Sequence, residues 1–337
     1  MKNDIILRVK NLTKWFPLRK GLLATFFGKE EYVRAVDGVS YDVRKGEILC
    51  LVGESGCGKT TTGKVSIRLI EPTGGEIDFY GRDIVALGKD EIRKLRCEMQ
   101  IIFQDPYESL DPRVNVYDAL AEPLIVHELA SSKEEERARV FKALEDVRLV
   151  PPEQFAKRYP HELSGGQRQR VAVARALILQ PKFIVADEPV SMLDASIRTE
   201  ISNLLTDLQK KYDLTYLYIT HDIAQARYIG SRVMVMYLGK IVEKGLMEDV
   251  LMDPLHPYTK ALISNVPVPD PAVKRERILI SGDTSTPVKV PPGCRFHPRC
   301  PHMKDKCSDE EPLLVESDET KEHYVACHYS MDLCGKR

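Results

Sequence analysis

Residues 53–64 read GESGCGKTTTGK, and this stretch decides the fold. Four positions, Gly53, Gly58, Lys59 and Thr60, fit the pattern G-x-x-x-x-G-K-[ST]. A bound phosphate needs several backbone N–H donors that point inward, and glycine permits the close approach because it has no side chain. The pattern therefore predicts a loop that cradles phosphate groups.

The flanking residues supply the structural context that such a loop requires. Residues 48–52, ILCLV, form a short apolar run typical of a buried parallel strand, and KVSIRLI at 64–70 is a plausible helix. In this strand, loop and helix arrangement, the Lys59 ammonium is expected to reach the β- and γ-phosphates of ATP. The Thr60 hydroxyl is expected to hold Mg²⁺.

Two further apolar runs end in polar residues. Residues 182–189, KFIVADEP, place Asp187 and Glu188 at the end of a predicted strand, where they suit a Mg²⁺ ligand and a general base for the attacking water. Residues 214–220, LTYLYIT, are followed by His221. A lone histidine after a strand is more often structural, but beside two other phosphate-facing strand ends it is a candidate contact to the γ-phosphate.

A second glycine-rich segment, LSGGQRQR at 163–170, directly precedes residues with helical periodicity. It predicts another anion-binding helix N-terminus in the same chain. With it, the sequence resembles the ABC-type ATPases. The resemblance rests on the signature LSGGQ, on a Q-loop at Gln104 in IIFQDP, on a D-loop SMLD that ends at Asp194 and on an H-loop at His221, all in the family's order over residues 5 to about 245.

The resemblance implies a composite site in which two nucleotide-binding domains pair head to tail. Glu188, His221 and Gln104 are then the catalytic residues, and Mg²⁺ is held through Thr60, Gln104 and Asp187. The signature residues that serve the partner's ATP are Ser164, Gly165, Gly166 and Gln167. The residues expected to bind this chain's own ATP are Phe16, Gly53, Glu54, Ser55, Gly56, Cys57, Gly58, Lys59, Thr60 and Thr61, with Trp15 as the alternative to Phe16 for stacking on adenine.

The fold class that the resemblance implies is an α/β P-loop NTPase of the ABC type. It has a RecA-like core, an antiparallel β subdomain, a helical subdomain at about 105–178 and a small cysteine-containing C-terminal extension. We expect an ABC ATPase domain over 1–250 and the extension over 251–337.

The extension narrows the branch of the family. HPYTKALISNVP at 256–267 and CRFHPRC at 294–300 resemble the C-terminal extension of the oligopeptide and dipeptide importer ATPases, and RYPHELSGGQRQR at 158–170 resembles their F-type subunit. The implied partners are a paralogous D-type ATPase as a heterodimer, two transmembrane permease subunits and an extracytoplasmic substrate-binding protein. The implied cargo is peptides, with oligosaccharides or nickel as alternatives.

Composition limits the remaining possibilities. A net charge of −1 gives no basic surface for nucleic acid. The sequence has neither a signal peptide pattern nor an apolar run of about 18 residues, so we expect a peripheral protein on the cytoplasmic face of the membrane. A soluble ABC ATPase and a metal or redox sensor are less favoured alternatives.

Four of the eight cysteines, Cys294, Cys300, Cys307 and Cys327, follow the ATPase region at irregular spacings. Zinc ribbons usually have paired C-x₂₋₄-C hooks, which this segment lacks, so a [4Fe-4S] cluster is expected. Zinc, with a histidine such as His297, His302 or His328, and unliganded thiols remain alternatives.

Overall fold

A computed structural model describes residues 4–18, 31–265, 278, 280, 288–318 and 321–330. The chain forms two compact units. The first, here called the helical unit, lies within residues 1–6, 43–48 and 86–219. The second, here called the P-loop unit, lies within residues 7–42, 49–85 and 220–337.

The helical unit contains a parallel sheet in the order β8-β7-β6. Its strands are β6 (Met99–Ile102), β7 (Phe183–Asp187) and β8 (Thr215–Thr220). Every residue of β7 and β8 is buried, as expected for parallel strands that are covered on both faces. The register pairs Asp187 of β7 with Ile219 of β8, so the last residue of β7 lies at the carboxyl edge of this sheet.

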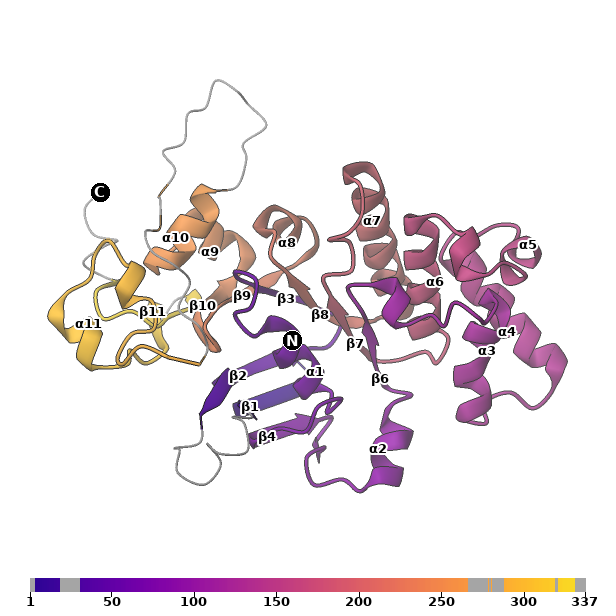
Figure 1. The fold of residues 1–337 in the computed structure, drawn as a ribbon, viewed down its shortest axis with the longest axis horizontal. Coiled ribbons are helices and arrows are strands. Elements are labelled where there is room, and N and C mark those ends of the chain that lie inside the picture. The colour runs from indigo at the N-terminus through magenta and orange to yellow at the C-terminus, as the bar shows by residue number, and fades with distance from the viewer. Residues whose placement is uncertain are drawn as a thin grey trace. The chain divides into compact units, whose positions relative to one another are not determined.

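Helices make up most of the rest of this unit, and α3, α4, α5 and α6 gather together (Figure 1). Buried apolar residues on one face of α4, such as Val140 and Leu144, pack into this group. The helices are α2 (Lys89–Leu95), α3 (Val116–Val126), α4 (Lys133–Asp146), α5 (Pro152–Ala156), α6 (Gly165–Leu177) and α7 (Ala195–Tyr212), with short 3₁₀ turns η1 (Pro106–Glu108) and η2 (Pro160–Glu162).

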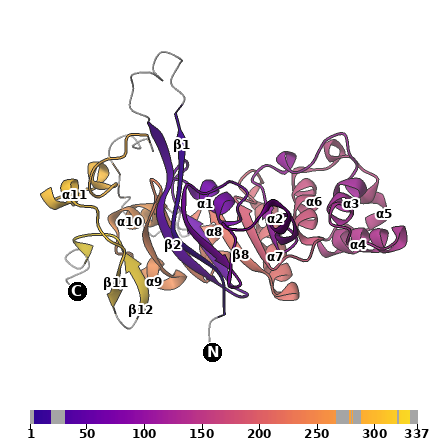
Figure 2. The same cartoon turned by 90° about the horizontal axis from the view of Figure 1, so that it is seen from below.

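An antiparallel sheet lies in the P-loop unit in the order β2-β1-β4-β5, and its two long strands run side by side (Figure 2). Alternating burial along β1 and β2 shows that one face of this sheet is packed and the other is open. The strands are β1 (Ile5–Pro17), β2 (Tyr32–Arg44), β4 (Gly74–Phe79) and β5 (Arg82–Asp83).

A second group of strands in the P-loop unit has the order β11-β12-β10-β9-β3. β3 (Ile48–Val52) runs parallel to β9 (Arg232–Tyr237), and the remaining pairs are antiparallel. β12 (Lys321–Val325) belongs to the C-terminal extension and pairs with β10 (Lys240–Leu246). The extension therefore continues this group of strands instead of forming a separate lobe.

This unit also contains several short helices. They are α1 (Lys59–Ser66), α8 (Ile223–Ile229), α9 (Met247–Met252), α10 (Pro257–Ser264) and α11 (Asp305–Asp309), with the 3₁₀ turn η3 (His297–Arg299). The strand at the edge of the group is β11 (Val315–Asp318). Tyr237 of β9, Tyr258 of α10 and Phe296 form a buried aromatic cluster with ring centroids 4.7 to 5.5 Å apart. This cluster joins the extension to β9 by apolar packing.

Candidate active site

The phosphate loop connects β3 to α1, as the sequence predicts. Gly53 and Gly58 both have positive φ angles, of 156° and 109°. A Cβ atom would lie 2.2 Å from the Met236 carbonyl oxygen at Gly53 and 2.0 Å from the Ala35 carbonyl oxygen at Gly58. Both positions therefore require glycine, because a side chain would collide with backbone that cannot rotate away.

Lys59 is the first residue of α1, and it is 5% exposed. Its Nζ atom donates to the carbonyl oxygens of Gly53 and Glu54, at 2.9 Å each. The N-cap of α1 is Gly58, so no side chain caps this helix. The first amides of α1 and the lysine ammonium are thus gathered around one loop, as anion binding requires.

Two contacts on this loop come from residues that sequence reasoning did not place in the site. The Glu54 amide donates to the Tyr258 hydroxyl at 2.8 Å, and the Glu54 carboxylate accepts from Arg299. Both partners lie in segments, HPYTKA and CRFHPRC, for which the sequence predicts a family branch and, in the second, metal-ligating cysteines, but no contact with the phosphate loop. Since their distance along the sequence is large, no local pattern could have revealed these contacts.

The carboxylates of KFIVADEP lie where the sequence places them. Asp187 is buried at the end of β7, and Glu188 follows it with a φ angle of 45°, which is rare for residues other than glycine. The Glu188 amide donates to the Ile219 carbonyl at 2.9 Å. The Gln104 side-chain amide donates to Oε2 of Glu188 at 3.4 Å. The predicted Q-loop glutamine and the predicted general base are therefore neighbours.

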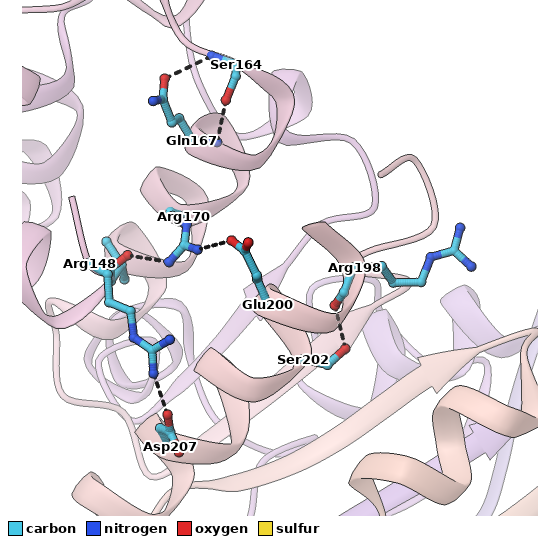
Figure 3. Close-up of polar contacts among 9 residues, drawn as sticks. Arg148, Ser164, Gln167, Arg170, Arg198, Glu200, Ser202 and Asp207 are labelled. Carbon is cyan, nitrogen blue, oxygen red and sulfur yellow. Dashed lines mark hydrogen bonds and ion pairs between the residues drawn. The ribbon is translucent and has the colours of Figure 1, made fainter. Parts of the chain in front are cut away.

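The signature segment begins α6. Ser164 is the N-cap, its hydroxyl accepts from the Gln167 amide at 3.3 Å, and the Gln167 side chain accepts from the Ser164 amide at 3.1 Å (Figure 3). A Cβ atom at Gly166 would lie 2.7 Å from the Ile197 Cγ2 atom of α7. This capping box fixes the start of the helix, and Ser164 is exposed, as a residue that serves a partner's nucleotide must be.

An ion pair links α6, the helix of the signature segment, to α7. Arg170 of α6 donates to the Val147 carbonyl at 3.0 Å and to Glu200 of α7 at 3.0 Å (Figure 3). Asp194, the D-loop residue, is the N-cap of α7 but makes no side-chain capping bond. Its assignment to the D-loop stays a prediction.

Two further predicted site residues, His221 and Phe16, belong to the P-loop unit. His221 follows β8 and is exposed, and Asp222 after it caps α8 by accepting from the amides of Ala224 and Gln225. Phe16 is half-buried, with the Lys14 ammonium 5.0 Å from its ring centre. The contact of His221 with a γ-phosphate and the stacking of Phe16 on adenine stay predictions.

The predicted metal centre of the extension is not supported. No group of three or more His, Cys, Asp or Glu within the described ranges is arranged to hold a metal ion. Two of the histidines considered for zinc each have a ring nitrogen bonded to a carbonyl oxygen, His297 to Cys294 at 2.9 Å and His328 to Glu310 at 2.9 Å.

The surroundings of the free thiols favour their neutral form. Burial, with smaller contributions from neighbouring cysteines, raises the pKa of Cys294 to about 11. The free Cys294 thiol is therefore protonated near neutral pH. The cysteine spacing alone did not contain this information.

None of the helices in the described part of the chain combines the length and apolar character that crossing a bilayer requires. Residues 36–191 match the family model described as ABC transporter. Residues 242–307 match the model described as oligopeptide/dipeptide transporter, C-terminal region.

Relatives match along nearly the full length. The chain is 47% identical over 328 residues to the Oligopeptide transport ATP-binding protein AppF of Bacillus subtilis (strain 168), covering 96% of this chain and 97% of that protein. It is 43% identical to the Dipeptide transport ATP-binding protein DppF of Haemophilus influenzae (strain ATCC 51907 / DSM 11121 / KW20 / Rd), covering 97% of this chain and 98% of that protein.

Among solved structures, the chain is similar to the ATP-binding cassette MJ0796, in a dimeric post-hydrolysis state bound to ADP and Pi, with a TM-score of 0.62 and 32% identity. That similarity covers 72% of this chain and 98% of the other. The predicted fold class and family are confirmed. This chain belongs to the ABC transporter ATP-binding subunits of the oligopeptide/dipeptide transporter family.

Proposed function

We propose that this chain is the ATP-hydrolysing subunit that powers import of di- and oligopeptides through a membrane ABC transporter. The observation that carries the proposal is the hydrogen bond from Gln104 to Glu188, which directly follows buried Asp187 in the chain. It supports assigning these three residues the roles of γ-phosphate sensor, general base and Mg²⁺ ligand. The full-length similarity to peptide and dipeptide transport ATP-binding proteins supports the peptide cargo.

In this mechanism the phosphate loop binds the nucleotide, with the Lys59 ammonium on the phosphates and the Thr60 hydroxyl as a Mg²⁺ ligand. Bound Mg²⁺ supplies charge neutralisation on the phosphate oxygens. Glu188 accepts a proton from the attacking water, and Gln104 orients the Glu188 carboxylate by donating to it. Ser164 and Gln167 present a capped helix N-terminus to the nucleotide of the second ATPase subunit.

The partners belong to the proposal. They are a paralogous D-type ATPase that completes the heterodimer, two permease subunits and an extracytoplasmic binding protein, with this chain on the cytoplasmic face. The apolar and aromatic surface around Gln104, Tyr107 and Met192, with Tyr107 51% and Met192 65% exposed, borders a pocket and suits a helix from a permease.

The test is transport by the reconstituted complex. Purified chain, its D-type partner and the permeases are placed in vesicles with the binding protein and radiolabelled peptides of two to six residues. Uptake that requires ATP and is abolished by Glu188→Gln supports the proposal. ATP hydrolysis that responds to an oligosaccharide or nickel binding protein, and not to peptides, would show that the cargo is not peptides.

The four cysteines of the extension need a separate test, because the described arrangement does not fit a metal. An anaerobically purified sample with a broad absorption band near about 400 nm holds an iron–sulfur cluster. A colourless sample with about one equivalent of zinc holds a zinc site. A colourless, metal-free sample, whose cysteines react with a thiol reagent once the chain is unfolded, agrees with the arrangement described above.

A further inference from the structure

The C-terminal extension contacts the phosphate loop through a buried arginine. Arg299 donates from Nη1 to Oε2 of Glu54 at 2.9 Å and from Nη2 to Oε1 at 3.2 Å. The Arg299 side chain is 8% exposed and that of Glu54 is 27% exposed. A two-pronged arginine–carboxylate pair with so little solvent is geometrically specific and only weakly screened by salt.

Arg299 is itself held in position. Its Nη1 atom also donates to the Tyr237 hydroxyl at 3.3 Å, and Tyr237 packs on Tyr258 and Phe296. The Tyr258 hydroxyl accepts from the Glu54 amide at 2.8 Å. The backbone and the side chain of Glu54 are therefore both fixed by residues that come later in the chain.

A second arginine of the extension reaches the same loop through a turn. Arg295, which is 5% exposed, donates to the Leu238 carbonyl and to the Asp37 carboxylate. Gly239, which follows Leu238 in the chain, donates from its amide to the Cys57 carbonyl of the phosphate loop at 2.8 Å. The Asp37 amide donates to the Gly239 carbonyl at 3.0 Å. Arg295 thus secures the turn on which the loop rests.

The charges explain why these contacts matter for a nucleotide. Glu54 places a carboxylate on a loop whose ligand carries several negative charges, and unpaired it would repel them. Arg299 neutralises this carboxylate, and its short two-pronged bond prevents the carboxylate from turning toward the phosphates. The Lys59 ammonium contacts the Glu54 carbonyl at 2.9 Å, so a shift of Glu54 would also act on the phosphate-binding lysine.

We propose that Arg299, supported by Arg295 and Tyr258, is a positioning residue through which the C-terminal extension sets the affinity of the phosphate loop for ATP. This inference rests on the proposed function only in requiring that ATP binds at Gly53–Thr61. It assigns the extension a role in nucleotide binding that a simple appendage would not have.

The experiment measures equilibrium binding of MgATP to the full-length chain and its variants. Arg299→Ala is expected to weaken binding about tenfold, because it leaves the Glu54 charge unpaired. The double variant Glu54→Gln/Arg299→Ala is expected to regain most of the affinity that Arg299→Ala loses, with the Glu54→Gln variant measured as its reference. The MgATP affinity of Arg299→Lys should lie between those of the wild-type chain and Arg299→Ala, since lysine keeps the positive charge but cannot form the two-pronged bond.

Arg227→Ala is the matched control. Arg227 forms another two-pronged pair in the same unit, with Glu248 at 3.1 and 2.9 Å, and no described contact joins this more exposed pair to the phosphate loop. Its loss should leave MgATP binding unchanged. A thermal unfolding curve for each variant separates loss of fold from loss of affinity, and an Arg299→Ala chain that stays folded should show weaker binding only.

Two results would overturn the inference. One is wild-type MgATP affinity in Arg299→Ala. The other is an equal loss of affinity when Arg299→Ala is introduced into the wild-type chain and into the Glu54→Gln variant, which would show that Arg299 does not act through Glu54. If the wild-type chain binds no MgATP, the proposed function fails first and the inference fails with it.

Discussion

The side chain of Gln104 donates a hydrogen bond to the carboxylate of Glu188 at 3.4 Å. Gln104 follows β6 and Glu188 follows β7, and these two strands are neighbours in a parallel sheet. Parallel strands present their carboxyl ends at the same edge, which is where ligands of open α/β sheets bind. The proposed proton acceptor and the proposed γ-phosphate sensor are therefore hydrogen-bonded to each other at this edge.

Replacing Glu188 with glutamine should remove the proton acceptor while preserving size and a hydrogen bond to Gln104. Hydrolysis in the assembled ATPase dimer should fall about 10²- to 10⁴-fold, with little change in MgATP affinity. Phosphate release and equilibrium nucleotide binding measure the two quantities. Glu98→Gln, at an ion pair with Lys182 in the same unit, should change neither. Unaltered turnover in Glu188→Gln would refute the general-base assignment.

The serine caps of two helices offer a matched pair. Ser164 caps α6 by accepting from the Gln167 amide, and Ser132 caps α4 by accepting from the Glu135 amide. Alanine at either position should lower the unfolding free energy by about 1 kcal/mol. Only Ser164→Ala should also reduce ATP hydrolysis by the dimer, by about tenfold or more, because only α6 carries the signature segment. Chemical denaturation and a hydrolysis assay distinguish the two effects, and equal activity in both variants would contradict the signature assignment.

Two glycines of the phosphate loop should respond differently to alanine. At Gly58, with φ of 109°, the added Cβ would lie 2.0 Å from a backbone oxygen, whereas at Gly56, with φ of 78°, no atom lies within 4 Å. Gly58→Ala should therefore cost about 3 kcal/mol or more and abolish nucleotide binding. Gly56→Ala should cost about 1 kcal/mol, which is the backbone penalty alone. Urea midpoints and nucleotide titration give both quantities. Similar losses in the two variants would show that the collision with Ala35 is relieved.

His256 should make stability depend on mild acid. Burial lowers its pKa from 6.5 to about 4, despite the opposing charge of Glu243, and its Nδ1 atom accepts from the Tyr258 amide at 3.1 Å. The unfolded chain takes up a proton at His256 near pH 6.5, and the folded chain does not. The stability that neutral His256 contributes is therefore present above pH 6.5 and is lost as the pH falls toward 4.

Between about pH 7 and pH 5, His256 should account for a fall of about 2 kcal/mol in unfolding free energy. His256→Asn keeps an acceptor for the Tyr258 amide and should flatten this part of the pH profile. Denaturation curves for both proteins across this range make the comparison, in which the pair of Glu243 and His323, joined at 2.7 Å, is common to both. Parallel profiles would show that His256 does not titrate as described.

Much of the site could be predicted because its chemistry depends on local pattern. The glycines at 53 and 58, the carboxylates that end β7 and the capped start of α6 each follow from a few consecutive residues. Such signals need no knowledge of what lies opposite, since backbone geometry and helix capping act over a few residues. The same local reasoning left an iron–sulfur cluster, zinc and unliganded thiols open for Cys294 and its neighbours, because ligand spacing does not show where folding places each thiol.

By itself, the sequence determined the loop, the strands, the signature helix and the family. Only the tertiary structure decided that Arg299 and Tyr258 meet Glu54, that Gln104 meets Glu188 and that the cysteines, among the residues the structure describes, are not arranged for a metal. The physical reason is the distance along the chain over which each kind of interaction acts. Local motifs are fixed by backbone dihedrals and neighbouring hydrogen bonds, whereas ion pairs, burial and pKa depend on which distant segments the folded core brings together.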